Sequence, residues 1–198
     1  MFEKLEGRAA RILDEDRYRK YAVIAPFLPG EDALLFEVRA PGLNRQPGEI
    51  CFPGGAVEKG ESPLEAAKRE TVEELLIPAE SLRVLAPLDV MAGSDRSLLY
   101  PYLAELRDYR GSFSRDEVAE VFTVPFSFFL NTEPIVHYNA VTVAPEEPEA
   151  VRRLLGVENY RWRGARYPEY FYPCGDRMIW GITARFVQNL VALYKAAH

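Results

Sequence analysis

The sequence predicts a single domain of the α/β class, with helices and strands mixed along the chain. Two observations support this class. The chain has 198 residues, of which 48% are hydrophobic, and this length is typical of one domain with its own core. Runs with helical periodicity also alternate with short apolar runs bounded by glycine and proline. We therefore expect residues 1–198 to form one domain, without an internal repeat or a low-complexity linker.

Charge and cysteine content exclude several classes of function. The chain has 24 basic and 30 acidic residues, a net charge of −6, and no basic cluster that would hold nucleic acid or an anionic membrane. Cys51 and Cys174 are too few for a disulfide framework. No signal core or membrane span is visible. We expect a soluble cytoplasmic protein that would hold a polyphosphate ligand by a local arrangement or through metal ions.

The first half of the chain predicts a helix, a hairpin and a short strand. Charged and aliphatic residues alternate in a helical manner from Phe2 to Leu13. Two β-like runs follow, and the intervening Pro-Gly-Glu-Asp sequence is typical of a turn. A loop rich in proline and glycine then leads to a third, short strand. The expected strands are Tyr21–Leu28, Ala33–Arg39 and Ile50–Phe52, with the loop at Ala40–Glu49.

The second half predicts further strands and a closing helix. The apolar runs Ser81–Val90 and Tyr100–Leu106 are typical of strands, and Ser114–Phe122 mixes a turn with a short strand or helix. Residues 131–172 show no clear period. Apolar residues then recur every three or four positions, which predicts a helix at Ile179–Lys195.

The best-defined helix is predicted at Pro63–Leu76. Ser62 suits the N-cap position and Pro63 suits the first helical position. Glu65 completes a Ser-x-x-Glu capping box, and Pro78 ends the pattern.

This helix presents three carboxylates on one face. At about 100° per residue, Glu70, Glu73 and Glu74 fall within roughly a third of a turn. Stability alone does not favour this layout, because Glu70 and Glu74 are a like-charge i,i+4 pair near a helix C-terminus. A divalent cation such as Mg²⁺ or Mn²⁺ would relieve the repulsion, since it prefers carboxylate oxygens. A solvated acidic face, partnered by Lys68 and Arg69, is the alternative.

The spacing around the helix resembles the Nudix box. That motif has Gly, five residues, Glu, seven residues, then Arg-Glu, an aliphatic residue, any residue, Glu-Glu, any residue, Gly and an aliphatic residue. Here Gly55 and Glu61 precede the run at residues 69–77 with this spacing. Two positions depart from the motif: Thr71 replaces an aliphatic residue and Leu76 replaces the glycine. We expect Leu76 to let the helix run one residue further.

The resemblance implies a Nudix-type α/β/α sandwich around a mixed β-sheet, and metal-dependent hydrolysis of a nucleoside diphosphate linked to another group. It implies that Glu70 and Glu74 are the principal ligands of Mg²⁺ or Mn²⁺, and that Glu73 is a further ligand or a base. The remaining implied roles belong to the Gly55 carbonyl as a backbone ligand and to Arg69 and Glu61 as residues that orient the carboxylates. A base from a later loop is the alternative, with Glu117 and Glu120 as candidates.

The segment before the box resembles the coenzyme A pyrophosphatase branch of this family. A paired-leucine strand at residues 34–39 leads to a loop with Gly48, followed by Phe-Pro-Gly-Gly at residues 52–55. The arginine of that branch falls on Asn44, with Arg45 adjacent and Arg39 nearby. Residues 179–184 also resemble the tail of the branch. The resemblance thus implies a substrate site that includes Arg39, Asn44, Arg45 and Gly54.

The leading prediction is hydrolysis of coenzyme A or acyl-coenzyme A to 3′,5′-ADP and 4′-phosphopantetheine or its acyl form. The alternatives are a pyrophosphatase for ADP-ribose or another nucleoside diphosphate derivative, and a nucleotide-sensing module without turnover. The expected partner is a small-molecule nucleotide, with a homodimer as one option. An aromatic group could stack an adenine, cover a pantetheine arm, or pack in the core or a dimer; it comprises Tyr160, Trp162, Tyr167, Tyr170, Phe171 and Tyr172.

Overall fold

A mixed eight-stranded sheet forms the centre of the protein. The computed structural model describes residues 5–157, 160 and 162–198. Strands follow the order β3-β2-β1-β7-β5, with β4 paired to β1, β6 to β7 and β8 to β2. The strand bounds are β1 Arg19–Leu28, β2 Ala33–Arg39, β3 Ile50–Cys51, β4 Gly54–Ala56, β5 Leu82–Pro87, β6 Met91–Ala92, β7 Ser97–Leu106 and β8 Val118–Pro125.

Both parallel and antiparallel pairs occur in this sheet. β1 and β2 form the predicted hairpin, in which Phe27 is opposite Leu34. β1 runs parallel to β7 from Arg19 to Phe27, whereas the other strand pairs of this sheet are antiparallel. The predicted mixed sheet is confirmed.

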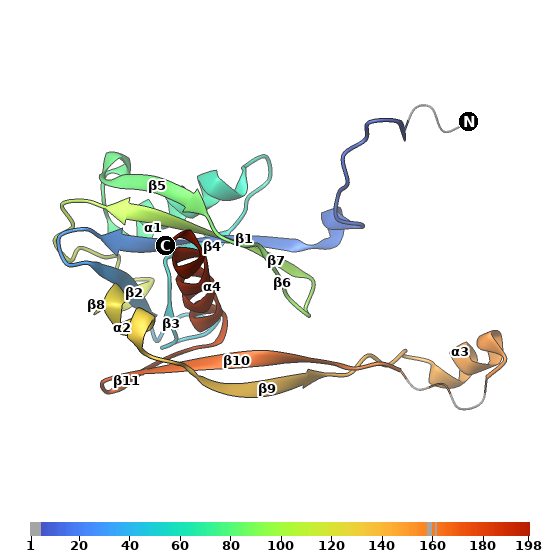
Figure 1. The fold of residues 1–198 in the computed structure, drawn as a ribbon. Coiled ribbons are helices and arrows are strands. Elements are labelled where there is room, and N and C mark those ends of the chain that lie inside the picture. The colour runs from blue at the N-terminus through green and yellow to red at the C-terminus, as the bar shows by residue number, and fades with distance from the viewer. Residues whose placement is uncertain (1–4, 158–159, 161) are drawn as a thin grey trace.

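Helices cover both faces of the sheet (Figure 1). Side chains alternate along β1, so Ala22 and Ile24 share a core with α1 (Pro63–Leu75), whereas Ala25 belongs to a second core. This second core contains residues of α2 (Phe126–Asn131) and α4 (Gly181–Ala197). The result is the α/β/α sandwich that the family resemblance implied.

α1 begins as the sequence predicts and ends earlier. Ser62 and Glu65 form the reciprocal capping box, with Pro63 in the first turn. The expectation that Leu76 extends the helix is wrong. Leu76 is the C-cap in the left-handed region, with φ 50° and ψ 49°. This conformation favours glycine, and Leu76 therefore keeps the backbone geometry of the motif at some conformational cost.

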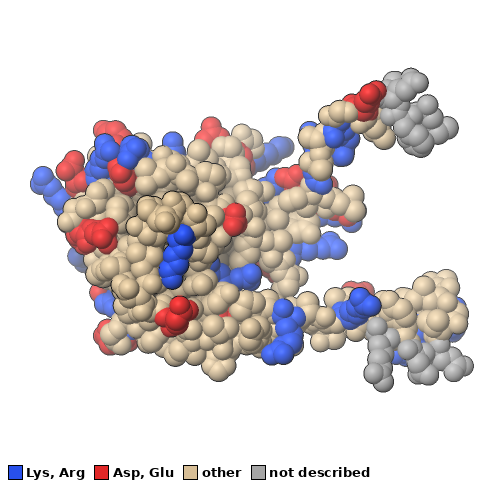
Figure 2. Space-filling view, in the orientation of Figure 1, with Lys and Arg blue, Asp and Glu red and all other residues tan. Residues whose placement is uncertain are grey.

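A second, three-stranded sheet has the order β11-β10-β9. β9 (Ile135–Val141) and β10 (Ala165–Cys174) form an arm that projects from the body, with α3 (Pro148–Leu155) at its far end (Figure 1). Figure 2 shows that this arm presents mostly uncharged atoms on the visible face. β11 (Arg177–Trp180) connects β10 to α4.

The predicted aromatic group does not form one surface. Tyr172 is fully buried in the core beneath α4, where its hydroxyl donates to Gln188 Oε1 at 2.6 Å. Tyr160 and Trp162 instead contact each other edge to face in the segment that follows α3. Core packing is thus confirmed for Tyr172, while nucleotide stacking and dimer packing stay predictions for the others.

Several predicted elements have different bounds in the structure. The expected helix at Phe2–Leu13 is wrong over residues 5–13, and residues 2–4 lie outside the described part; a short 3-10 helix occupies Glu15–Arg17. The closing helix begins at Gly181, because residues 179–180 belong to β11. The mixed segment at residues 114–122 is a turn followed by β8. A second 3-10 helix lies at Ala79–Ser81.

Candidate active site

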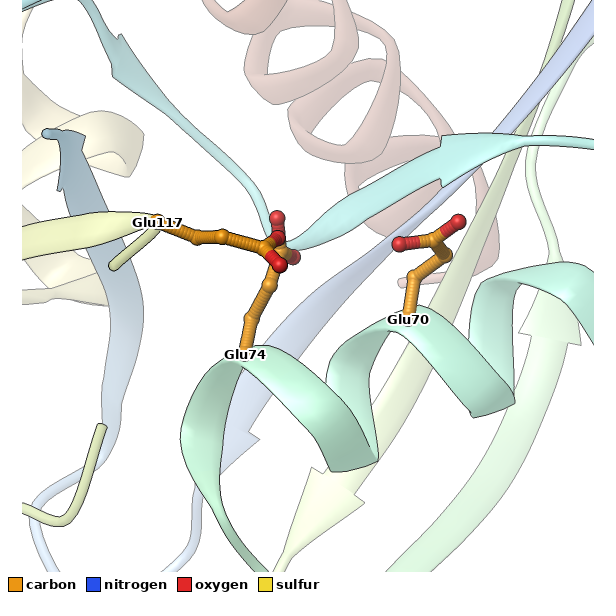
Figure 3. Close-up of side chains that lie close together, drawn as sticks. All are labelled: Glu70, Glu74 and Glu117. Carbon is orange, nitrogen blue, oxygen red and sulfur yellow. The ribbon is translucent and has the colours of Figure 1, made fainter. Parts of the chain in front are cut away.

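Three carboxylates meet beside the C-terminal half of α1. Glu70 and Glu74 project from successive turns of the helix, and Glu117 approaches from the turn before β8 (Figure 3). One carboxylate oxygen from each residue lies within 4.8 Å of the others. Glu74 is 2% exposed, Glu70 is half-buried and Glu117 is exposed. The group is therefore open on the Glu117 side and closed on the Glu74 side.

Backbone contacts to the end of α1 hold Glu117 in this position. The Ser114 amide donates to the Glu74 carbonyl at 2.7 Å, and the Ser112 hydroxyl donates to the Leu75 carbonyl at 2.7 Å. These bonds satisfy carbonyls that a helix C-terminus leaves free. The Glu117 carbonyl in turn accepts from the Ala40 amide at 2.8 Å. The turn that carries Glu117 is thus fixed to both α1 and the end of β2.

In the absence of a cation, burial and, after it, the nearby carboxylates of Glu37, Glu70 and Glu117 together raise the pKa of Glu74 to about 9. One hydrogen bond opposes this shift, because the Gly54 amide donates to Glu74 Oε2 at 2.8 Å. A buried carboxylate beside like charges is costly unless a positive charge compensates it. The closed side of the group is therefore an electrostatically favourable position for a cation.

The two glycines of β4 leave room for the carboxylates. A Cβ atom on Gly55 would lie 2.4 Å from the Glu70 carboxyl group. A Cβ atom on Gly54 would lie 2.3 Å from the Ala22 carbonyl oxygen, because β4 runs directly against β1. The neighbouring backbone requires glycine at Gly54, whereas glycine at Gly55 leaves the Glu70 carboxylate in its place.

Arg69 links α1 to the loop before it. Its guanidinium donates to both Glu61 carboxylate oxygens at 3.0 and 3.1 Å, and to Glu70 Oε1 at 2.9 Å. It also donates to the Ala56 carbonyl at 3.3 Å. These bonds raise the pKa of Arg69 and lower that of Glu61. The arrangement is suited to orienting Glu70, the role that the family resemblance gave to Arg69 and Glu61.

The structure separates Glu73 and Glu120 from the carboxylate group. The Glu73 side chain is 57% exposed and pairs with Arg69 at 3.4 Å. Glu120 lies on β8 and pairs with Arg177 at 2.7 Å. Of the two bases proposed from a later loop, the structure brings Glu117 to the group. The roles of Glu73 and Glu117 in chemistry remain predictions.

The predicted substrate residues lie around the loop between β2 and β3: Arg39 ends β2, Asn44 and Arg45 lie in the loop, and Gly54 lies in β4. Arg45 donates to the Tyr21 hydroxyl at 3.1 Å, and Arg39 donates to the Arg45 carbonyl at 3.3 Å. Asn44 is exposed in the same loop. Tyr21 pairs in register with Ala56, beside the glycines of β4. The two arginines thus form one basic group near the strand that borders the carboxylates.

Sequence reasoning missed Glu37, which is fully buried on β2. Its burial and the adjacent carboxylates make it part of the same electrostatic environment as Glu74. The available signal was a glutamate between Phe36 and Val38 in an otherwise apolar strand. A charged residue in a buried strand needs a partner, and such residues are frequent at functional sites.

The donor set fits a hard divalent cation. It consists of carboxylate oxygens from α1 and from the turn before β8, with the backbone of Gly55 beside Glu70. Mg²⁺ and Mn²⁺ prefer such oxygen ligands, whereas softer metals prefer sulfur and nitrogen. Glu70 and Glu74 would hold the ion with Glu117 beside it, and a partly exposed arrangement leaves positions for water and for phosphate oxygens. This fit agrees with the burial of Glu74 beside other carboxylates, where a cation would favour its charged form.

The site combines carboxylates on α1 with the two glycines of β4, on an α/β/α sandwich. This combination is typical of a class of metal-dependent enzymes that act on phosphate compounds. The NUDIX domain model matches residues 18–154, and the chain belongs to this family. It is a Nudix hydrolase. Enzymes of this family hydrolyse phosphorus-containing anhydrides, act on small nucleotide derivatives and generally use divalent metal ions.

Two curated relatives differ in how much of the chain they cover. The peroxisomal coenzyme A diphosphatase NUDT7 of Mus musculus is 35% identical over 123 residues, which are 60% of this chain and 51% of that protein. The match thus spans about half of the mouse protein. The uncharacterized Nudix hydrolase NudL of Enterobacter sp. (strain 638) is 30% identical over 194 residues, 96% of this chain and 88% of that protein.

Among solved structures, DR0079 from Deinococcus radiodurans has a TM-score of 0.48 and 22% identity over 57% of this chain and 70% of that chain. In the described part of the chain, none of the helices has both the length and the apolar character that a membrane crossing requires.

Proposed function

We propose that the protein hydrolyses the diphosphate of coenzyme A or acyl-coenzyme A to 3′,5′-ADP and 4′-phosphopantetheine or its acyl form, with Mg²⁺ or Mn²⁺ as cofactor. The observation that carries the hydrolysis is the group formed by Glu70, Glu74 and Glu117, whose oxygens lie within 4.8 Å of one another. The substrate rests on the segment at residues 34–55 and on the likeness to a coenzyme A diphosphatase.

The reaction requires water to attack a phosphorus atom while the bond from that phosphorus to the bridging oxygen breaks. A bound divalent cation supplies charge neutralisation of the phosphoryl oxygens and lowers the pKa of an attacking water. Glu70 and Glu74 would hold this cation, and the hydrogen bond from Arg69 orients Glu70 for it. Glu117, the exposed member of the group, is placed to accept the proton of the water, with Glu73 as the second candidate.

Recognition of the adenosine end is assigned to the loop between β2 and β3. Arg39 and Arg45 give this loop two positive groups held by hydrogen bonds to the protein, which suits the 3′-phosphate of coenzyme A. A groove of about 450 Å³ borders the same loop and is lined by Ile50, Met178 and Trp180 among others. Its apolar part is suited to the pantetheine arm.

The experiment is to incubate the protein with coenzyme A, dephospho-coenzyme A and ADP-ribose, each with Mg²⁺ or Mn²⁺, and to separate the products by chromatography. We expect metal-dependent release of 3′,5′-ADP from coenzyme A, with a higher kcat/KM than for the other two compounds. Arg45→Ala should raise KM for coenzyme A more than for dephospho-coenzyme A, because only the former carries the 3′-phosphate.

Each outcome is decisive for one part of the proposal. Equal kcat/KM for coenzyme A and dephospho-coenzyme A would show that the 3′-phosphate is not recognised and would overturn the roles of Arg39 and Arg45. Hydrolysis of ADP-ribose alone would replace the substrate and keep the metal-dependent chemistry. Tight binding of coenzyme A without product over hours would identify a sensing module instead.

A further inference from the structure

Glu37 is a fully buried carboxylate that the chemistry above does not use. It lies on β2, whose alternating side chains place it on the same face as Leu35, which packs in the core beneath α1. It is therefore directed to the side of the sheet that carries Glu70 and Glu74. Its exposed fraction is 0%.

Only one of its two carboxylate oxygens has a partner among the described residues. Glu37 Oε1 accepts a hydrogen bond from the Cys51 thiol at 3.2 Å. Glu37 Oε2 is buried and has no hydrogen-bond partner in the described part of the chain. Burying a carboxylate oxygen without a partner is costly, and such groups are uncommon in folded proteins. The free oxygen therefore indicates a ligand.

The surrounding charges restrict what this ligand can be. The carboxylates of Glu70 and Glu117 repel the negative charge of Glu37 and raise its pKa. Glu37 raises the pKa of Glu74 in the same way. The positive charge of Arg39 lowers the pKa of Glu37. The Arg39 guanidinium, however, donates its hydrogen bond to the Arg45 carbonyl. The Cys51 thiol is held neutral, because burial raises its pKa well above the usual value. An anion would add to the repulsion, whereas a cation or the water bound to one would reduce it.

A water ligand fits this position better than direct coordination. The group whose oxygens approach within 4.8 Å consists of Glu70, Glu74 and Glu117 and does not include Glu37. Mg²⁺ and similar ions keep several waters in their coordination shell, and carboxylates behind the ligands commonly hold them. A metal-bound water is a strong hydrogen-bond donor, which is the partner that Glu37 Oε2 lacks.

We propose that Glu37 is a positioning residue of the metal centre, in which its free oxygen accepts a hydrogen bond from a water bound to the divalent cation that Glu70 and Glu74 hold beside Glu117. This inference rests on the proposed metal centre but not on the identity of the substrate. It accounts for a buried glutamate in an apolar strand and for its unpartnered oxygen.

The test compares Mn²⁺ binding to the wild type, Glu37→Gln and Glu37→Met by calorimetry without substrate. Methionine has a similar volume to glutamate and no strong hydrogen-bond acceptor. We therefore expect Glu37→Met to bind Mn²⁺ about 10–100-fold more weakly, the usual effect of losing a residue that hydrogen-bonds to a metal ligand. Glutamine keeps a neutral hydrogen-bond acceptor, so Glu37→Gln should lose less Mn²⁺ affinity than Glu37→Met. Thermal melting in EDTA supplies the second readout, and Glu37→Met should melt at the same temperature as the wild type or higher.

Glu74→Gln separates failure of this inference from failure of the metal centre. If Glu74→Gln abolishes Mn²⁺ binding and Glu37→Met binds as tightly as the wild type, the role of Glu37 is wrong and the metal centre stands. If Glu74→Gln also binds as tightly, the metal centre itself is wrong. A lower melting temperature of Glu37→Met in EDTA would overturn the proposal, because it would show that Glu37 stabilises the fold without metal.

Discussion

Glu74→Gln is expected to lower kcat/KM for the diphosphate substrate by about 10²–10³-fold, the scale reported for removal of one electrostatic group in an active site. Glutamine keeps the shape of Glu74 and can still accept the hydrogen bond from the Gly54 amide. It removes the charge that would hold the cation. The variant should therefore have a lower kcat/KM and a lower metal affinity, with the fold unchanged.

The same substitution should stabilise the protein when metal is removed. The folded-state pKa of Glu74 is raised from the ordinary value of 4.5 to about 9. A carboxyl group with a raised pKa favours the folded state least at high pH, so its contribution to stability falls as pH rises from about 4.5 to about 9. In EDTA, the variant Glu74→Gln should therefore be more stable than the wild type, by a margin that grows over this pH range. The margin arises because Glu74 is buried beside Glu37, Glu70 and Glu117.

The measurement combines steady-state kinetics with thermal melting in EDTA at pH 5 and pH 8. Glu80→Gln is a matched control, since Glu80 is exposed in the short helix at Ala79–Ser81. A Glu74→Gln enzyme with wild-type kcat/KM would contradict the assignment of this residue to the metal centre. A variant that melts below the wild type at both pH values would contradict the electrostatic account of its burial.

Gly54→Ala and Gly55→Ala are expected to fail in different ways. A Cβ atom on Gly54 would lie 2.3 Å from the Ala22 carbonyl and 2.6 Å from the Val23 Cα atom. Backbone atoms of a central strand cannot move aside, so the free energy of unfolding should fall by about 3 kcal/mol or more. The φ of 150° at Gly54 adds to this cost.

At Gly55 the new Cβ would meet the flexible end of Glu70, 2.4 Å away. The carboxylate can turn aside, so stability should change by about 1 kcal/mol or less. Its displacement from the metal centre should nevertheless lower kcat/KM by about 10²-fold, the effect of an ångström-scale misplacement.

Urea denaturation and steady-state kinetics on both glycine variants separate the two effects, with Gly60→Ala as a control in open space. The control has a φ of +91°, so it reports the conformational cost of alanine without a steric contact. Equal destabilisation by Gly54→Ala and Gly60→Ala would show that the contact with β1 is not decisive. An unchanged kcat/KM for Gly55→Ala would show that Glu70 has room elsewhere in the site.

The sequence predicted α1 and its chemistry well because the signals are local. The capping box depends on Ser62 and Glu65, three residues apart, and the acidic face depends on a helical period. The hairpin of β1 and β2 was likewise predicted from a short turn. For such features, the residues that determine the structure are close together in the chain.

The features that the sequence left open or missed depend on contacts between distant segments. Glu117 joins the carboxylate group because Ser114 caps the end of α1, and no periodicity in the sequence indicates that contact. Glu37 is brought beneath α1 by strand pairing, and only its isolation among apolar residues could have drawn notice. Leu76 adopts a conformation typical of glycine, which the residue type argues against and the tertiary structure imposes.

The arm of β9 and β10 was not predicted for a similar reason. β9 is exposed along almost its whole length, so its side chains show no alternation between core and solvent. Without alternation, hydrophobic patterning gives no strand signal. Its pairing with β10 links residues 135–141 to 165–171, across the segment that contains α3.

The most direct test of the metal centre is a crystal structure with Mn²⁺, in which anomalous scattering locates the ion. The account predicts a Mn²⁺ peak coordinated by carboxylate oxygens of Glu70 and Glu74, with Glu117 at or next to the ion and a bound water directed to Glu37. A peak elsewhere on the protein, or none at these carboxylates at millimolar Mn²⁺, would contradict the proposal that α1 carries the chemistry.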